Sequence, residues 1–435
     1  MKEVYAIIKT KIPGPRSAKV LKILQKKNGP RNSPYPFVYQ SGSGCYVKDV
    51  DGNVFLDFGS QIATQPLGYN HPDLREVMRE YAKMSPVKIA GQDFATREHA
   101  EMLEELTKIA PPGMNAAFVI NSGAEAVENA MKICMRRRKA TKIGISFEGA
   151  FHGRTLGALS ATNSKVVQKR GFLSMNMRRL PFDEIAGEVL QKIAAREVSA
   201  EEIGFVILEH VQGEGGYNIA SKKMVKSIRN VTQELGIPLI ADEVQSGMGR
   251  TGKWWAFQHF GIKPEVMSVA KALQVGATIA NKKWFPDEES AISSTWGGGH
   301  MLDLALGIQI IRTIKKRNLL RNAEKMGTYF HKGMQIMQEQ LSHVQNVRGL
   351  GLMRAFDLPS RKMRDDVIIE AVKRGLILIG CGQRSVRVIP PLIIHQKEVD
   401  EGLAIIEESI RKCGVPRFRH AGAICAFMDC GQSST

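Results

Sequence analysis

Short runs of apolar residues alternate with helix-forming stretches between about residues 115 and 280, and this alternation constrains the fold more than any other feature. The runs are continuous, which is typical of strands buried on both faces of a parallel sheet. The expected strands are 116–120, 142–146, 204–209, 238–242 and 266–271, and the expected helices include 124–139 and 223–235. A β-α-β-α order predicts an α/β fold with a mainly parallel central sheet and helices on both sides.

Polar residues end four of these predicted strands. Ser122, Glu209, Asp242 and Lys271 stand at the end of an apolar run or directly after it. In open α/β sheets, ligands bind at the carboxyl ends of the strands. We therefore expect these side chains, which are far apart in the sequence, to form one site.

The segments on either side predict a smaller unit. Residues 45–57 have the pattern of a β-hairpin with Asp51-Gly52 at its turn, 318–345 predict a long amphipathic helix, and 385–389 predict a strand that is ended by two prolines. We expect a small α+β domain built from both termini, residues 1–60 and 318–415, and a large domain of residues 61–317. The tail 416–435 stays unassigned.

The charge balance is strongly basic. The 435 residues carry a net charge of +18, and residues 1–48 hold ten Lys and Arg against the single acid Glu3. Such an excess suits nucleic acid, an acidic membrane surface or anionic small molecules. The basic residues lack interleaved aromatics and a recognisable nucleic-acid-reading module, so a solvated surface is favoured over nucleic-acid binding. No run of about 18 uncharged apolar residues occurs, so no span of a membrane is expected.

The six cysteines are scattered, without a C-x-x-C pair or a histidine cluster at metal-ligand spacing. This pattern favours neither a disulfide scaffold nor a metal site, and it fits a reducing compartment such as the cytoplasm. A mitochondrial transit peptide is not favoured, because the basic N-terminus is interrupted by Pro13-Gly14-Pro15 and is rich in Lys rather than Arg and Ser.

Lys271 and Asp242 form a chemically informative pair. A lysine buried at a strand end loses its proton readily and can form a Schiff base. An aspartate beside it can hold the protonated ring nitrogen of a pyridine cofactor, so the pair suits pyridoxal phosphate. Each residue taken alone has an ordinary alternative, a solvated lysine and a helix-capping aspartate.

Asn121-Ser122-Gly123-Ala124 stands where a strand gives way to a helix. Backbone N–H groups at a helix N-terminus bind phosphate, although Ser122 is equally suited to cap an ordinary helix. A second phosphate-loop candidate, residues 247–253, follows the Walker-B-like strand 238–243. It has Trp254 where a Ser or Thr must bind Mg²⁺, so a nucleoside triphosphatase is not favoured.

Five motifs in register resemble the class III pyridoxal-phosphate aminotransferases, a family that includes 4-aminobutyrate, ornithine and lysine 6-aminotransferases and some amino-acid racemases. The resemblance covers about residues 15–412, and the motifs are Asn-Ser-Gly-Ala-Glu-Ala (121–126), Phe-His-Gly-Arg-Thr (151–155), Glu-His-Val-Gln-Gly-Glu-Gly-Gly (209–216), Ala-Asp-Glu-Val-Gln-Ser-Gly (241–247) and Ser-Thr-Trp-Gly-Gly (294–298). It implies the fold of the type I pyridoxal-phosphate transferases.

The resemblance also implies cofactor contacts. Lys271 would be the Schiff-base lysine and proton carrier, and Asp242 would keep the ring nitrogen protonated. Phe151 and Val244 would sandwich the ring, Gln245 would hydrogen-bond its hydroxyl, and the phosphate would be held by Ser122, Gly123 and Ala124. His152 and Glu209 would also lie at the cofactor. Thr295 would reach the phosphate bound by a neighbouring subunit, which implies a homodimer, or a higher oligomer of dimers, with shared active sites.

Three further positions match the family's substrate residues. Arg154 would bind a distal carboxylate and Arg387 an α-carboxylate, while Glu214 would cover Arg387 until a dicarboxylate displaces it. We expect an aminotransferase that moves the amino group of an ω-amino acid (4-aminobutyrate, lysine or ornithine type) to 2-oxoglutarate by a ping-pong mechanism. The alternative is a racemase with the same cofactor. The short loop 271–277 resembles the lysine 6-aminotransferase branch, and residues 61–69 and 92–96 are expected to select the donor.

Overall fold

A seven-stranded sheet forms the centre of the computed structural model, which describes residues 5–29, 35–84, 93–138, 140–293, 298 and 300–414. In sheet order the strands are β4 (Ala116–Ile120), β10 (Gly276–Ala280), β9 (Val266–Val269), β8 (Leu239–Asp242), β7 (Ile203–Leu208), β5 (Ile143–Phe147) and β6 (Met177–Leu180). The five strands from β9 to β6 are parallel to one another, whereas β10 is antiparallel to both β4 and β9. The prediction of a mainly parallel sheet is confirmed.

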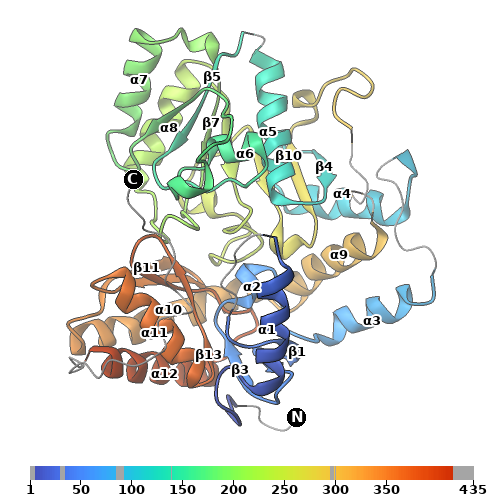
Figure 1. The fold of residues 1–435 in the computed structure, drawn as a ribbon. Helices are drawn as coiled ribbons and strands as arrows, with labels where there is room; N and C mark the ends of the chain where they lie inside the picture. The colour runs from blue at the N-terminus through green and yellow to red at the C-terminus, as the bar shows by residue number, and fades with distance from the viewer. Residues whose placement is uncertain are drawn as a thin grey trace.

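Helices cover both faces of this sheet (Figure 1). Phe205 and Ile207 of β7 pack in a cluster with residues of α5, whereas Val206 and Leu208 pack with residues of α7 and α8. Since side chains alternate along a strand, a continuously apolar strand is buried on both sides. The helices of this part of the chain are α3 (Pro72–Tyr81), α4 (Arg97–Ile109), α5 (Gly123–Arg138), α6 (Leu156–Ala161), α7 (Ala186–Arg196), α8 (Lys222–Glu234) and α9 (Met301–Lys316), of which α3 packs against α9.

The two ends of the chain share a second sheet. It has the order β1 (Tyr39–Ser43), β2 (Tyr46–Asp49), β3 (Val54–Asp57), β13 (Leu376–Ile377), with β13 parallel to β3. The predicted hairpin is confirmed, since β2 and β3 are antiparallel and Gly52 at the turn has a φ of +89°. The pairing of β3 with β13 agrees with a unit built from both termini, and the proposed boundaries at residues 60 and 317 stay a prediction.

A third sheet is antiparallel and comes from the C-terminal part alone. Its order is β11 (Gln345–Leu350), β12 (Met353–Asp357), β15 (Ser385–Val388), β14 (Ile379–Cys381). The remaining helices are α1 (Pro15–Lys27), α2 (Ser60–Ala63), α10 (Leu319–Gln340), α11 (Arg361–Lys373) and α12 (Gln396–Gly414), and the short 3-10 helices are η2 (Val166–Gln168), η3 (Ala200–Glu202), η4 (Ala256–His259), η5 (Lys271–Leu273) and η6 (Lys282–Trp284).

The predicted helix 318–345 extends five residues beyond the C-terminal end of the observed helix α10, which is Leu319–Gln340. Helix α10 stops at Gln340, and residues from Gln345 onward form β11. The backbone N–H of Leu341 still bonds to Met337, but Leu341 itself is extended and buried. Leu341 and Val344 are buried in the core. We attribute the end of the helix at Gln340 to this burial, which the pattern of residue types does not reveal.

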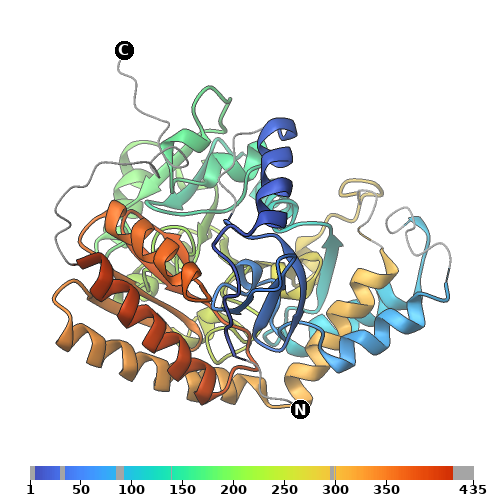
Figure 2. The same ribbon diagram turned by 60° about the horizontal axis from the view of Figure 1, so that its bottom comes forward.

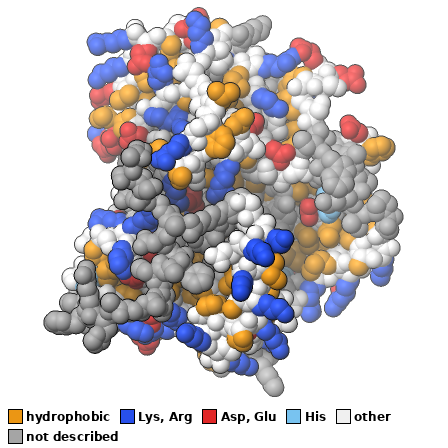
Figure 3. All heavy atoms as spheres, viewed as in Figure 1, with side chains coloured by type: hydrophobic (Ala, Val, Ile, Leu, Met, Phe, Trp, Pro, Cys, Tyr) orange, Lys and Arg blue, Asp and Glu red, His pale blue; other side chains and the backbone are white. Residues whose placement is uncertain are grey.

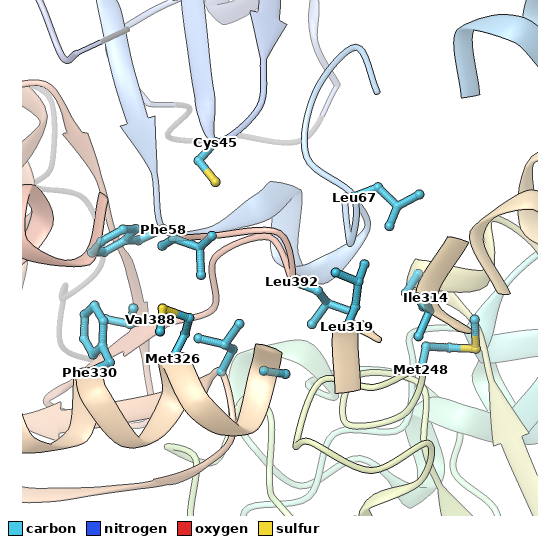
Figure 4. Packing of buried hydrophobic residues seen from close by; sticks show 14 of the residues in the cluster. Cys45, Phe58, Leu67, Met248, Ile314, Leu319, Met326, Phe330, Val388 and Leu392 are labelled. Carbon is cyan, nitrogen blue, oxygen red and sulfur yellow. The ribbon is translucent and has the colours of Figure 1, made fainter. Parts of the chain in front are cut away.

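The largest core cluster joins residues from distant parts of the chain. Figure 4 shows Phe58, Met326, Phe330 and Val388 gathered around α10, and the rings of Phe58 and Phe330 meet edge to face at 5.4 Å. This core also contains residues of β9 and β10. The terminal segments are thereby fixed against the central sheet.

The basic N-terminus forms an exposed helix. In Figure 2, α1 projects from the N-terminal strands, and Ser17 is its only buried residue. Its basic side chains, Arg16, Lys19, Lys22, Lys26 and Lys27, are exposed. Lys and Arg are prominent over this face of the molecule in Figure 3. The location agrees with the predicted solvated basic surface.

Candidate active site

A cavity of about 460 Å³ lies at the carboxyl ends of the central strands. Glu209 follows β7, Asp242 ends β8, Lys271 lies two residues beyond β9, and Ser122 lies two residues beyond β4. Eleven of the predicted site residues line this cavity: Ser122, Gly123, Ala124, Phe151, His152, Arg154, Glu209, Asp242, Val244, Gln245 and Lys271. The structure thus brings together the four polar strand ends that the sequence singled out.

Lys271 begins η5 with a φ of +52°. This left-handed conformation is uncommon for a residue with a side chain, and such strain is concentrated at functional sites. Burial lowers the pKa of the Lys271 amine, against the opposing effect of the Asp242 carboxylate. A larger fraction of the amine is therefore neutral at a given pH, as a nucleophile requires.

Asp242 is buried and held in place from two sides. Its Oδ2 lies 2.7 Å from Nδ1 of His152, and its Oδ1 accepts the backbone N–H of Val244 at 3.0 Å. His152 is fixed in turn because its backbone N–H donates to the hydroxyl of Thr162 at 2.9 Å. The Asp242 carboxylate is thus held in one orientation by His152 and by the Val244 backbone.

Glu209 organises two loops. Its Oε1 accepts the backbone N–H of Phe151 at 2.8 Å, and its Oε2 accepts that of Gly213 at 2.9 Å. Burial raises the pKa of Glu209 to about 7, with His152 opposing the shift and Asp242 adding to it. Both carboxylate oxygens are used by the backbone, so Glu209 positions the ring of Phe151 rather than presenting a free acid.

The N-terminus of α5 opens onto the cavity. Ser122 Oγ donates to Glu125 Oε2 at 2.8 Å and accepts the Glu125 backbone N–H at 3.3 Å, so this serine caps the helix as the alternative interpretation held. A Cβ on Gly123 would lie 2.7 Å from Val244 Cγ1. Only glycine lets the helix start come this close to the Asp242 loop, and backbone N–H groups there suit an anion.

The two side chains expected to flank the cofactor ring, Phe151 and Val244, both line the cavity. Gln245 Oε1 accepts a hydrogen bond from the Tyr217 hydroxyl at 2.8 Å, which orients its amide. The guanidinium carbon of Arg154 lies 5.3 Å from the centre of the Phe151 ring. Arg154 is exposed, so its charge is available at the mouth of the cavity.

Glu214 and Arg387 are not among the residues that line the cavity, and they pair with each other. Arg387 Nη2 lies 2.7 Å from Glu214 Oε1, and the Arg387 side chain is 3% exposed. Burial acts to raise the pKa of Glu214, but Arg387 and then Lys165 hold it below its usual value. Glu214 is therefore a carboxylate that neutralises a buried guanidinium.

Several residues contact the site although the sequence analysis did not predict a role for them. Thr162 fixes the His152 loop, Tyr217 orients Gln245, and the Gln274 side chain donates to the Thr64 carbonyl at 2.8 Å. Thr64 lies within the predicted pocket wall 61–69 and lines the cavity. Gln274 has a φ of +69°, which no pattern of residue types revealed.

Three predictions fall on residues outside the described part of the chain. Thr295 is one, and the tail 416–435 is another. Gln92 of the second predicted wall is outside as well, whereas residues 93–96 are described. Within the described part of the chain, no helix combines the length and apolar character needed to cross a membrane.

The donor set fits pyridoxal phosphate. A partly buried amine and a buried carboxylate in one cavity suit the aldehyde and the ring nitrogen, an aromatic ring and a branched aliphatic side chain line the same cavity, and a glycine-containing helix N-terminus suits the phosphate. Together with the seven-stranded sheet, this site defines a pyridoxal-phosphate-dependent transferase of fold type I.

Comparison with known families identifies the class further. A family model described as "Aminotransferase class-III" matches residues 28–410, and the chain belongs to this family of pyridoxal-phosphate-dependent aminotransferases. The chain is 34% identical over 383 residues to an acetylornithine aminotransferase of Archaeoglobus fulgidus, a match that covers 85% of this chain and 94% of that protein. It is 30% identical to the human mitochondrial 4-aminobutyrate aminotransferase, with 89% and 87% covered.

Solved structures agree with this assignment. A lysine aminotransferase from M. tuberculosis superposes with a TM-score of 0.84 at 26% identity, covering 91% of this chain and 99% of that one. The expected fold class, cofactor and enzyme class are therefore confirmed.

Proposed function

We propose that this enzyme transfers the terminal amino group of an ω-amino acid to 2-oxoglutarate by a ping-pong mechanism, giving an aldehyde and glutamate. The relatives support donors of this kind, since they are described as acetylornithine, 4-aminobutyrate and lysine aminotransferases. Each of those names denotes a substrate with an amine at the end of a short aliphatic chain.

The ion pair between Glu214 and Arg387 is the observation that carries this proposal. An ω-amino donor has no carboxylate beside its reacting amine, so a bare buried guanidinium there would be an unpaired charge. Glu214 neutralises it. A 2-oxoglutarate molecule does have a carboxylate beside its reacting carbon, and this group would replace Glu214 in a bidentate pair with Arg387.

The other side chains take complementary roles in the proposal. Pyridoxal phosphate, when bound, supplies the carbonyl that takes up the amino group and a ring that withdraws electrons. The Lys271 amine carries the proton to and from the substrate carbon. Asp242, oriented by His152, supplies the negative charge that keeps the ring nitrogen protonated. Arg154 binds the distal carboxylate of either substrate.

The resemblance further supports a homodimer in which Thr295 reaches the cofactor phosphate of the partner subunit. We also propose the cytoplasm as its compartment, from the scattered cysteines of the sequence. Residues 61–69 and 92–96 would select among donors, and the short loop 271–277 resembles that of the lysine 6-aminotransferase branch.

A donor screen tests the proposed reaction. Purified holoenzyme is incubated with 2-oxoglutarate and 4-aminobutyrate, lysine, ornithine or N-acetylornithine in turn, and glutamate is measured. We expect glutamate with at least one donor and none with the Lys271→Ala variant. If every donor fails, the proposal is wrong. Loss of optical activity from an amino acid without any oxo-acid would support the racemase instead.

A further inference from the structure

Glu214 has two cationic partners in the structure, and only one of them belongs to the expected substrate site. Its Oε1 pairs with Arg387 at 2.7 Å, while its Oε2 lies 3.6 Å from Nζ of Lys165. Lys165 comes from the segment after α6, and its side chain is 49% exposed. Arg387 is buried on β15. One carboxylate therefore stands between a buried and a half-exposed cation.

Two hydrogen bonds hold the backbone at Glu214 and just after it. The Glu214 carbonyl accepts the N–H of Gly382 at 2.8 Å. Two residues further on, the Gly216 carbonyl accepts Nε–H of Arg348 at 3.0 Å. Both bonds join the loop to the C-terminal part of the chain. A departure of Glu214 from Arg387 is thereby confined to its side-chain torsions, which rotate far more easily than a hydrogen-bonded loop moves.

A carboxylate that leaves Arg387 needs another positive partner, because an unpaired, mostly buried charge is costly. Among the described residues, Lys165 is the other cation that pairs with Glu214. Its long, half-exposed side chain can follow the carboxylate.

We propose that Lys165 is the positioning residue that holds Glu214 while Arg387 binds the α-carboxylate of a dicarboxylate. This inference rests on the proposed function and assigns the displaced position of Glu214 that the second half-reaction requires. Lys165 lowers the free energy of that position and so strengthens dicarboxylate binding without touching the ligand.

Glutarate is a suitable probe, because it has both carboxylates but no oxo group and therefore binds without reacting. Its Kd is measured by titration calorimetry on holoenzyme of the wild type, Lys165→Met, Lys165→Arg and Arg170→Met. We expect Lys165→Met to bind glutarate about two- to fivefold more weakly, the scale of a partly exposed ion pair. Lys165→Arg keeps the positive charge and should bind glutarate with the affinity of the wild type. Arg170→Met, which removes an exposed charge from the same segment, should match the wild type.

A double-mutant cycle separates positioning from direct contact. In a Glu214→Gln background no charged side chain is left to be held, so Lys165→Met should no longer change the Kd. A loss of affinity that persists in this background would overturn the proposal, because Lys165 would then bind the ligand itself.

The same preparations distinguish this inference from the proposed function. If the wild type forms no glutamate from 2-oxoglutarate with any ω-amino donor, the proposed function is wrong. If it does form glutamate and Lys165→Met leaves the glutarate Kd unchanged, only the role of Lys165 is wrong.

Discussion

Burial lowers the pKa of the Lys271 amine, and the proposed role of this amine gives the shift a measurable pH dependence. Burial lowers the pKa of Lys271, whereas the hydrogen bond from Lys223 to Glu184 raises the pKa of that fully exposed lysine. Only the neutral amine reacts with an acylating reagent. A lower pKa therefore shifts the onset of modification to lower pH.

We accordingly predict that Lys271 of the cofactor-free enzyme becomes reactive at a lower pH than Lys223. Acetic anhydride labelling at a series of pH values, followed by peptide mass spectrometry, gives the midpoint for each lysine. The two lysines differ in how easily the reagent reaches them, which changes the rate of labelling at every pH. The midpoint of the pH curve does not depend on this difference. A Lys271 midpoint equal to that of Lys223 or above it would contradict the effect of burial.

Asp242 is the second residue to which the proposed mechanism gives a charge-dependent role. Asp242→Asn keeps the shape of the side chain but removes the negative charge opposite the cofactor ring. We expect kcat to fall at least about a hundredfold, the scale of losing a preorganised electrostatic contact. The exposed Asp287→Asn serves as the matched control and should retain wild-type kcat. Near-normal kcat in Asp242→Asn would remove this residue from the mechanism.

At the scale of elements, the sequence predicts best where a strand is a continuous apolar run. The expected strands 116–120 and 204–209 correspond to β4 and β7 within one residue at either end, because uninterrupted apolar runs bounded by polar residues leave little freedom. The polar ends of these strands located Ser122 and Glu209, and those of the expected strands 238–242 and 266–271 located Asp242 and Lys271. Local pattern and topology together therefore predicted the core of the site.

Patterns of apolar runs do not predict other elements of the sheet. Strand β6 contains Arg178 and Arg179 at the sheet edge and has no apolar run, while the antiparallel direction of β10 depends on long-range pairing. Thr162 lies outside the five motifs, and Tyr217 follows the motif 209–216 without belonging to it. Their roles depend on side-chain hydrogen bonds that only the folded chain creates.

The start of α5 makes a close contact with β10 that can be tested. A Cβ on Gly276 would lie 2.3 Å from the Ser122 carbonyl oxygen and force the backbone to move. We expect Gly276→Ala to lower the free energy of unfolding by about 1–3 kcal/mol and to weaken pyridoxal phosphate binding. Thermal unfolding and a cofactor titration measure the two effects.

Gly29→Ala is the matched control for this substitution, since nothing lies within 4 Å of a Cβ at Gly29. It should leave both the unfolding temperature and the cofactor affinity unchanged. If Gly276→Ala changes neither the unfolding temperature nor the cofactor affinity, the N-terminus of α5 tolerates displacement. The close approach of Ser122 to Gly276 would then have no role in the proposed phosphate site.

At the scale of the whole molecule, the proposed homodimer predicts complementation between two defective chains. Lys271→Ala lacks the lysine of its own site, and Thr295→Ala lacks the residue expected to reach the partner's site. A hybrid dimer of the two would contain one intact site of its two. Co-expression with different tags and sequential purification isolates the hybrid.

We expect the hybrid to be clearly more active than either parent, and sedimentation of the wild type to give about twice the chain mass of 48.2 kDa. Co-purification of two wild-type chains with different tags is the control for dimer formation. A hybrid no more active than its parents would contradict shared active sites, and a monomeric wild type would contradict the dimer.

The transfer of a terminal nitrogen to 2-oxoglutarate is the central claim, and isotope labelling tests it most directly. Ornithine and lysine, each labelled with ¹⁵N at either the terminal or the α position, are incubated with holoenzyme and 2-oxoglutarate, and the glutamate formed is analysed by mass spectrometry. The pairing of Glu214 with Arg387 predicts ¹⁵N in glutamate from the terminally labelled donor. Glutamate labelled only from the α position would contradict the account.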